Sequence, residues 1–273
     1  MSPYDLTNLA ALKAWLGLPS AAGLNDATLT ALITAASRSI YAAISRPSLL
    51  PQSYTETIDL ETQRVTLRQW PVTQVVSVTW RGIAVPRDQN ADLEASVGYA
   101  LEPGDGVPPG RPQALDLFGH QYRPGRQRLI VSYSAGYAVQ NEAQTVPAAA
   151  PFQLTTLAPY GPWGSDVGVT YAASGAALIS VAAPPGAGQY SVSGGAYTFS
   201  AADAGQSVLI AYGYVPQDIA QAALELAAER FRAAERIGLK SKSMGGQETI
   251  AYDMTAMSAP ILSMLQPYKR VAL

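Results

Sequence analysis

The chain has 273 residues and a formal net charge of −2, from 18 basic and 20 acidic residues. This near balance excludes an overall electrostatic basis for gripping nucleic acid, which requires a basic surface. The chain has no cysteine, which excludes disulfides, thiolate metal ligands and cysteine nucleophiles, and its 48% hydrophobic content predicts a packed core.

Residues 5–45 predict two helices joined by a turn. The first spans 5–17, with Asp5 as its expected N-cap and Gly17 at its end. The second spans 26–45, with Asn25 as its cap and Pro47 beyond its end. Apolar residues recur at helical spacing in both, namely Leu9, Leu12 and Leu16, and then Leu29, Leu32, Ile33, Ala36, Ile40 and Ile44. These elements predict a helical hairpin.

Neither a membrane span nor a leader is expected from the sequence. We find no run of about 18 apolar residues, the length that a bilayer requires. The first residues lack a basic segment and carry Asp5 early, so they do not resemble a signal peptide. The pattern therefore predicts synthesis in a cytosol.

The pattern changes to strands after Pro47. Alternating stretches at 54–60, 64–70, 72–80 and 126–137 predict β-strands, with a turn at Arg81-Gly82. The segment 102–112, EPGDGVPPGRP, is too rich in glycine and proline for regular structure and is expected to be a loop.

Residues 140–212 differ sharply in composition from the rest of the chain. They contain three charged residues, Glu142, Asp166 and Asp203, and neither lysine nor arginine. Short strands alternate with turns, including a tight turn at Asp203-Ala-Gly205, which predicts a small antiparallel β module.

A sequence pattern that occurs twice suggests how this module joins the chain. LIVSYSAGYAV (129–139) and VLIAYGYVP (208–216) share a strand followed by Tyr, Gly and Tyr, and only the second leads into a helix. The repeated pattern favours an insertion between the last strand of a parent domain and its long helix. One continuous β domain with a chance repetition is the alternative.

A long helix is predicted to follow Pro216 and to stop near Gly238, with Asp218 in its first turn. Its alanine-rich stripe suits close packing on helices of the same chain or of a neighbouring subunit. A flexible polar hinge, SKSMGGQ (241–247), and a short apolar helix complete the chain. The stripe consists of Ala220, Leu224, Ala227, Ala228, Phe231 and Ala234.

No catalytic or cofactor-binding constellation is present in the sequence. His120 is the one histidine, and a lone histidine is far more often a surface or hydrogen-bonded residue than a ligand. Asp105 lies between two glycines, where a turn explains it. No phosphate-binding, nucleophile-elbow or metalloprotease motif occurs. We therefore expect a protein that is not an enzyme and has no cofactor or metal.

Several stretches occur together in one order: LAALKAWLGLP, DATLTALITAASRSIYAAISRP, YTETIDL, LRQWPVTQVVSV, RLIVSYSAGY, QAALELAAERFRAAERIG and a terminal LQPYKR. In this order they resemble the head–tail adaptor (connector) proteins of tailed bacteriophages, over residues 1–137 and 214–273. Pattern and resemblance together predict an α+β fold. Its expected parts are an adaptor core (1–139 and 214–240) with a helical hairpin, a long helix and a small antiparallel β part, an inserted sandwich-like all-β module (140–213), and an extended C-terminal docking arm (241–273).

The resemblance implies a virion structural protein located in the neck and made in the host cytoplasm. Such subunits form a ring, usually of twelve, beneath the portal, extend the DNA channel and present a platform for the next neck or tail-completion protein. Their C-terminal arm docks on the portal protein. The matching arm residues here are Ile250, Tyr252, Met254, Met257, Ile261, Leu262, Met264, Leu265, Tyr268, Lys269 and Arg270.

Two further interpretations accompany this one. The tail could instead fold back on its own core, and Leu224, Phe231, Arg232 and Arg236 of the long helix are assigned to subunit or core packing. A different class of protein, a β-rich surface module that binds glycan or protein on a helical base, would need an export route. Its stacking face would be Tyr160, Trp163 and Tyr171.

Basic residues gather in two places that could meet DNA or an acidic partner. The first comprises Arg111, Arg123, Arg126 and Arg128, and the second spans 230–242. Because the chain as a whole is nearly neutral, we expect packaged DNA to pass without tight binding.

Overall fold

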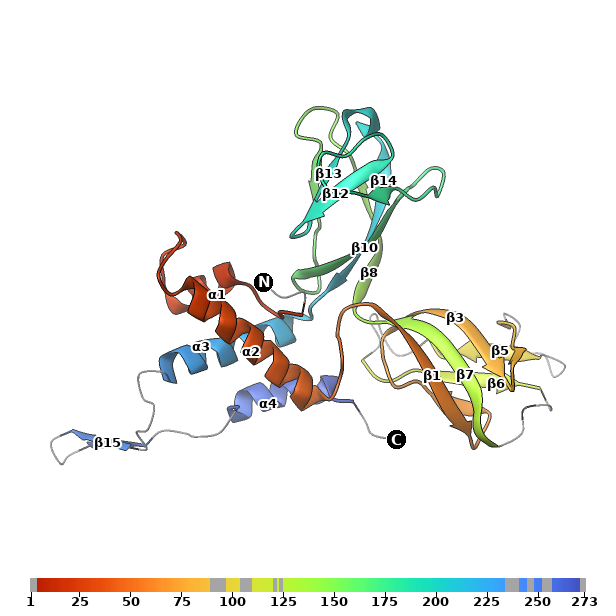
Figure 1. The fold of residues 1–273 in the computed structure, drawn as a ribbon, viewed down its shortest axis with the longest axis horizontal. Coiled ribbons are helices and arrows are strands. Elements are labelled where there is room, and N and C mark those ends of the chain that lie inside the picture. Colours follow the sequence, from red (N-terminus) through yellow and green to blue (C-terminus); the bar gives the residue numbers. More distant parts are fainter. Residues whose placement is uncertain are drawn as a thin grey trace. The chain divides into compact units, whose positions relative to one another are not determined.

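The computed structural model describes residues 4–88, 97–103, 110–119, 122, 125–233, 241–244, 248–251 and 257–270. The fold is α+β, as expected, with helices contributed by both ends of the chain and strands between them (Figure 1). Internal contacts define a helical unit (Met1–Pro47, Tyr160–Pro162 and Val215–Lys269) and a β unit (Ser48–Pro159, Trp163–Tyr214 and Arg270–Leu273). Residues 48–139 thus group with the inserted residues rather than with the helices, and the discontinuous adaptor core stays a prediction.

Helix α1 (Leu9–Leu16) begins later than the sequence indicates. Asn8, not Asp5, is the N-cap, and its side chain accepts a hydrogen bond from Ala11 N at 2.8 Å. Asp5 instead accepts a hydrogen bond from Thr34 Oγ1 at 2.9 Å, and Leu6 N donates to Ser37 Oγ at 3.0 Å. These bonds to the second helix hold residues 5 and 6 outside α1.

Helix α2 (Asp26–Ile44) matches its predicted range, although Asn25 forms no side-chain cap bond. Lys13 and Asp26 join α1 to the start of α2 through an ion pair of 2.6 Å, and the Lys13 side chain is only 6% exposed. Lys13 Nζ also donates to Ala21 O at 2.7 Å. A buried ammonium requires such partners, so this pair fixes the corner between the two helices.

Helix α3 (Gln217–Ala233) packs against α1, α2 and the last helix, α4 (Ala259–Leu265). Arg230 of α3 donates a hydrogen bond to Ser39 of α2 at 2.8 Å. The predicted stop near Gly238 lies outside the described residues. Most of the circumference of α3 is covered, because it buries Ile219, Ala220, Ala222, Ala223, Leu224, Leu226, Ala227 and Ala228.

The segment between α3 and α4 contains a hairpin where a flexible hinge was predicted. Strands β15 (Ser241–Met244) and β16 (Glu248–Ala251) pair antiparallel as a two-stranded sheet. The prediction of a hinge weighed the serine and glycine content of this stretch. It missed that SKSM can pair with ETIA, in which Thr and Ile favour strands.

The first part of the β unit has two antiparallel sheets around one core. The larger has the order β1 (Gln52–Leu60), β7 (Gly125–Ala135), β3 (Val72–Trp80), β4 (Ile83–Ala84), and the smaller β2 (Arg64–Thr66), β6 (Ala114–Phe118), β5 (Gly98–Leu101). The predicted strand at 64–70 is shorter because Gln69 N donates to Tyr133 Oη and Pro71 has no N–H. Both sheets contribute to the core, which includes Leu60, Val65, Leu67, Val78, Tyr99, Leu115, Leu117, Leu129, Val131 and Tyr133.

The second part of the β unit contains the residues of the predicted module. One sheet has the order β10 (Trp163–Tyr171), β14 (Ser207–Tyr214), β8 (Ala138–Thr145), and the other β11 (Ile179–Ser180), β12 (Gln189–Ser193), β13 (Ala196–Phe199), β9 (Gln153–Thr155). The module is not wholly antiparallel, since β11 and β12 run parallel. Its ends meet, because Gly213 pairs with Ala138.

Candidate functional site

Some residues of the predicted docking arm are buried against the helical unit and others are exposed to solvent. Ile261 and Leu265 of α4 are 0% and 3% exposed on the helical unit, whereas Leu262 is 44% exposed and Lys269 is also exposed. α4 therefore folds back on its own helices, as one sequence interpretation expects, and portal docking stays a proposal. The other arm positions are half-buried (Met257, Met264, Tyr268 and Arg270), lie in β16 (Ile250), or fall outside the described residues (Tyr252 and Met254).

The predicted packing residues of α3 lie in different surroundings. Leu224 is buried, Phe231 is half-buried and Arg232 is exposed, while Arg236 falls outside the described residues. Sequence reasoning missed a second stripe, Ile219, Ala222, Ala223 and Leu226, which follows the same helical spacing. Its existence makes α3 the central helix of its unit.

Each acidic residue of 140–212 accepts a hydrogen bond from a tyrosine hydroxyl. Sequence reasoning missed these pairs, although the absence of any cation from the segment was a signal that another donor must serve. Carboxylates with little exposure require such donors. The pairs are Tyr212 with Glu142 (2.5 Å), Tyr190 and Tyr197 with Asp166 (2.6 and 3.0 Å), and Tyr171 with Asp203 (2.6 Å).

The first β part repeats one of these pairs. Tyr133 donates to Glu56, and both side chains are buried. In each case the tyrosine hydroxyl also accepts a backbone N–H at 3.1 Å, from Gln69 for Tyr133 and from Ala158 for Tyr212. In each case, too, the tyrosine stands two residues beyond the partner paired with the glutamate, which is Val131 for Glu56 and Ile210 for Glu142.

Four of these tyrosines are held in their neutral form. The hydrogen bond to Asp203 raises the pKa of Tyr171 to about 12. Burial raises the pKa of Tyr133, Tyr190 and Tyr197 well above the ordinary tyrosine value. A tyrosine that stays a hydrogen-bond donor at neutral pH orients a carboxylate without supplying a nucleophile. Each pair therefore holds its carboxylate in place within the β unit.

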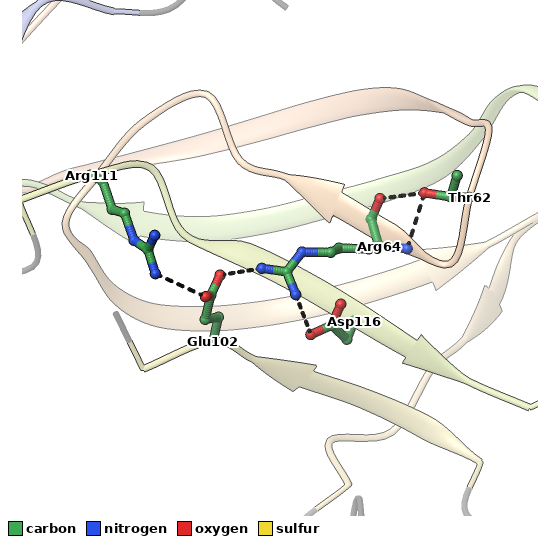
Figure 2. A network of polar contacts seen from close by, with 5 residues as sticks. All are labelled: Thr62, Arg64, Glu102, Arg111 and Asp116. Carbon is green, nitrogen blue, oxygen red and sulfur yellow. Dashed lines mark hydrogen bonds and ion pairs between the residues drawn. The ribbon is translucent and has the colours of Figure 1, made fainter. Parts of the chain in front are cut away.

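A polar network covers part of the smaller sheet of the first β part (Figure 2). Arg64 lies 2.8 Å from Glu102 and 3.7 Å from Asp116, and Arg111 lies 3.3 Å from Glu102. Thr62 Oγ1 donates to Arg64 O at 2.8 Å. Both arginine side chains are more than half exposed, so solvent screens these pairs, and they mainly align β2, β5 and β6.

The residues of the first predicted basic group differ in their surroundings. Arg111 is paired with Glu102, Arg126 is exposed and Arg128 is half-buried at the start of β7, and Arg123 lies outside the described residues. His120 and Asp105 also lie outside them. Of the predicted stacking residues, Trp163 donates its Nε1–H to Tyr197 Oη at 3.3 Å and Tyr171 donates to Asp203, and the stacking face stays a prediction.

The helical unit contains a cavity of about 510 Å³ at the C-terminal half of α2. Arg38, the buried Arg46, Tyr41 and Asp5 help to line it. Within the part of the chain that the structure describes, no group of three or more His, Asp or Glu side chains could hold a metal ion. The described lining of the cavity thus offers cationic and hydroxyl groups.

Helix α2 is long and apolar enough, by length and composition, to cross a membrane, which the sequence analysis did not expect. Core helices pass the same test. Leu29, Ile33, Ile40 and Ile44 are fully buried inside the helical unit, whereas Arg38 is exposed. We interpret α2 as a core helix on this ground.

Comparison with known proteins gives distant structural likeness only. No family model matches the chain, and no curated protein matches its sequence. A chain of a solved structure described as "Neck of empty GTA particle computed with C6 symmetry" is similar with a TM-score of 0.42 and 14% identity, over 100% of this chain and 94% of that one. A chain of "Virion of native gene transfer agent (GTA) particle" gives 0.43 and 13% over the same shares. Likeness this distant assigns neither family nor function.

Proposed function

We propose that the chain is a non-enzymatic structural protein of a tailed phage-like particle, a head–tail adaptor that forms a ring beneath the portal. The observation that carries the proposal is the order of elements. A helical hairpin, a β part, a long helix and a short terminal helix follow one another as the resemblance requires, and the two ends of the chain build one helical unit. In this proposal the β residues 140–213 are an insertion whose ends meet on β8 and β14.

The ring would join the capsid to the next neck or tail-completion protein and extend the DNA channel. The near-neutral charge and the pairing of Arg64 and Arg111 with carboxylates support passage of DNA without tight binding. Twelve copies is the number that the resemblance implies. Tight, salt-dependent binding of duplex DNA by the purified protein would contradict this part of the proposal.

The docking surface is narrower than the sequence indicated. Since Ile261 and Leu265 face the helices of their own chain, we assign portal docking to the outward side of α4 and its flanks, including Leu262 and Lys269. An exposed leucine and an exposed lysine on one terminal segment suit the apolar centre and polar rim of a protein interface.

Electron microscopy of the purified protein mixed with its portal tests the proposal. Ring-shaped particles on the portal are expected, and Leu262→Asp should prevent them without unfolding the protein. Leu24→Asp is the matched control, because Leu24 is a fully exposed apolar residue between α1 and α2. A protein that ignores the portal, or one in which both variants attach equally well, would overturn the function or the docking surface respectively.

A further inference from the structure

The surface on which α4 packs, here called its seat, is small and is formed by α2 and α3. Ile261 and Leu265 stand four residues apart on one face of the helix and are its two buried side chains. α4 contacts α3 and α2, and Tyr268 adds a long hydrogen bond of 3.4 Å to Asp218. The attachment therefore depends on one apolar pair and the helix surface beneath it.

α4 has little helical stability of its own. It has seven residues, its N-cap Ser258 forms no side-chain cap bond, and an isolated helix shorter than about 12 residues is marginal in water. The surface of α2 and α3 is what makes this segment helical. Every copy of the chain offers the same surface.

The connection between α3 and α4 is long. α3 ends at Ala233 and α4 begins at Ala259. Ser241 and Ala251 pair across the hairpin, so β15 and β16 add little length. The remaining 234–240 and 252–258 contain seven residues each and together span at most about 50 Å when extended. That limit exceeds the roughly 25 Å length of α3, so the length of the connection does not confine α4 to its own chain.

We propose that α4 is exchanged between copies, so that in the ring it occupies the α2–α3 surface of the neighbouring subunit. The proposal rests on the ring proposed above. Exchange replaces each contact by an identical one, and neighbours in a ring are held at high effective concentration. The inward face of α4 then interlocks the subunits, while Leu262 on its outward face remains available to the portal.

Cross-linking distinguishes exchange from folding back, because the chain has no cysteine of its own. Gln217→Cys and Gln266→Cys place two thiols at exposed positions next to the Asp218–Tyr268 contact. Rings of the double variant on the portal, treated with a flexible bis-maleimide, should give a ladder of covalently linked chains on a denaturing gel. A product linked only within single chains, or no product, would overturn the exchange.

Two further variants test whether the cross-linked products depend on the packing of α4 against α2 and α3. Ile261→Asp should abolish the ladder, and Ser263→Asp, at an exposed position of the same helix, should preserve it. If no ring forms on the portal, the ring itself is refuted, and the exchange is tested in concentrated free protein. Mixing Gln217→Cys chains with Gln266→Cys chains should then give a two-chain product, and its absence would refute the exchange.

Discussion

The hydroxyl of Tyr212 lies 2.5 Å from the carboxylate of Glu142. Glu142 is only 9% exposed. The same carboxylate accepts hydrogen bonds from Leu157 N at 3.0 Å and from the side chain of Gln144 at 2.5 Å. Three donors around one carboxylate join β14, β8 and the segment after β9. The hydrogen bonds of Glu142 therefore connect these elements to one another.

Removing the Tyr212 hydroxyl should destabilise the β unit. Tyr212→Phe removes one hydrogen-bond donor from a buried carboxylate and leaves the amide N–H of Ala158 without its acceptor. Losses of this kind lower the free energy of unfolding by about 1–3 kcal/mol. Tyr133→Phe should cost a similar amount because its bonds are equivalent. Urea unfolding measures both. Thr57→Val, which removes an exposed hydroxyl from β1, should change stability by less than about 0.5 kcal/mol, and an equal loss there would contradict the assignment.

Stability should fall in alkali as tyrosines ionise. The bond to Asp203 raises the pKa of Tyr171 to about 12, so the folded state holds a proton that the unfolded state releases near pH 10. The contribution of this bond is fully present below pH 10 and is lost as pH rises toward 12. Urea midpoints at pH 8–11.5 should show the decline, and Tyr171→Phe should reduce its slope. An unchanged slope would rule out this tyrosine as a source.

Acid should loosen the corner between α1 and α2. The hydrogen bond from Lys13 lowers the pKa of Asp26, so this ion pair contributes stability above the ordinary aspartate value of about 3.9. That contribution is lost as pH falls through the lowered pKa. Circular dichroism at 222 nm in urea, from pH 6 to pH 2.5, should show a smaller acid-induced loss for Lys13→Met than for the unaltered chain. An identical pH dependence would mean that the pair is not linked to unfolding.

Truncating the inward face of α4 should release the helix from its seat. Ile261→Ala removes a fully buried side chain, a change that costs about 2–5 kcal/mol in a rigid core and comparable free energy from a small docked helix. Amide hydrogen exchange over 259–265 should accelerate toward the rate of unprotected chain. Leu262→Ala, on the exposed side, should leave the exchange rate almost unchanged.

Local periodicity was sufficient for the most regular elements. α2 and β3 have their predicted ranges because their apolar residues recur with one clear period. Helix α1 started later because Asp5 and Leu6 are engaged by Thr34 and Ser37, residues about 30 positions away that no local pattern reveals. The hairpin at 241–251 was missed because serine and glycine content was weighed above strand pairing.

The candidate site was harder to predict than the elements. Ile261 and Leu262 are adjacent apolar residues in the sequence, yet one faces the helical unit and the other faces outward. Which side of a short helix is covered depends on α3, whose own second stripe went unrecognised. The tyrosine–carboxylate pairs likewise depend on strand register, which brings Glu142 beside Tyr212 across 70 positions.

The hydrogen bond between Ser39 and Arg230 spans 191 positions of the chain. During synthesis α1 and α2 are therefore made long before α3. Until α3 is made, Leu29, Ile33 and Ile40 of α2 lack part of the apolar surface that buries them in the folded unit. The strands between α2 and α3 are made in the interval and can pair first. A chain stopped before residue 217 would be left with an uncovered helical hairpin, which makes it a target for chaperones and proteases. Only chains that include α3 would then have a covered helical unit.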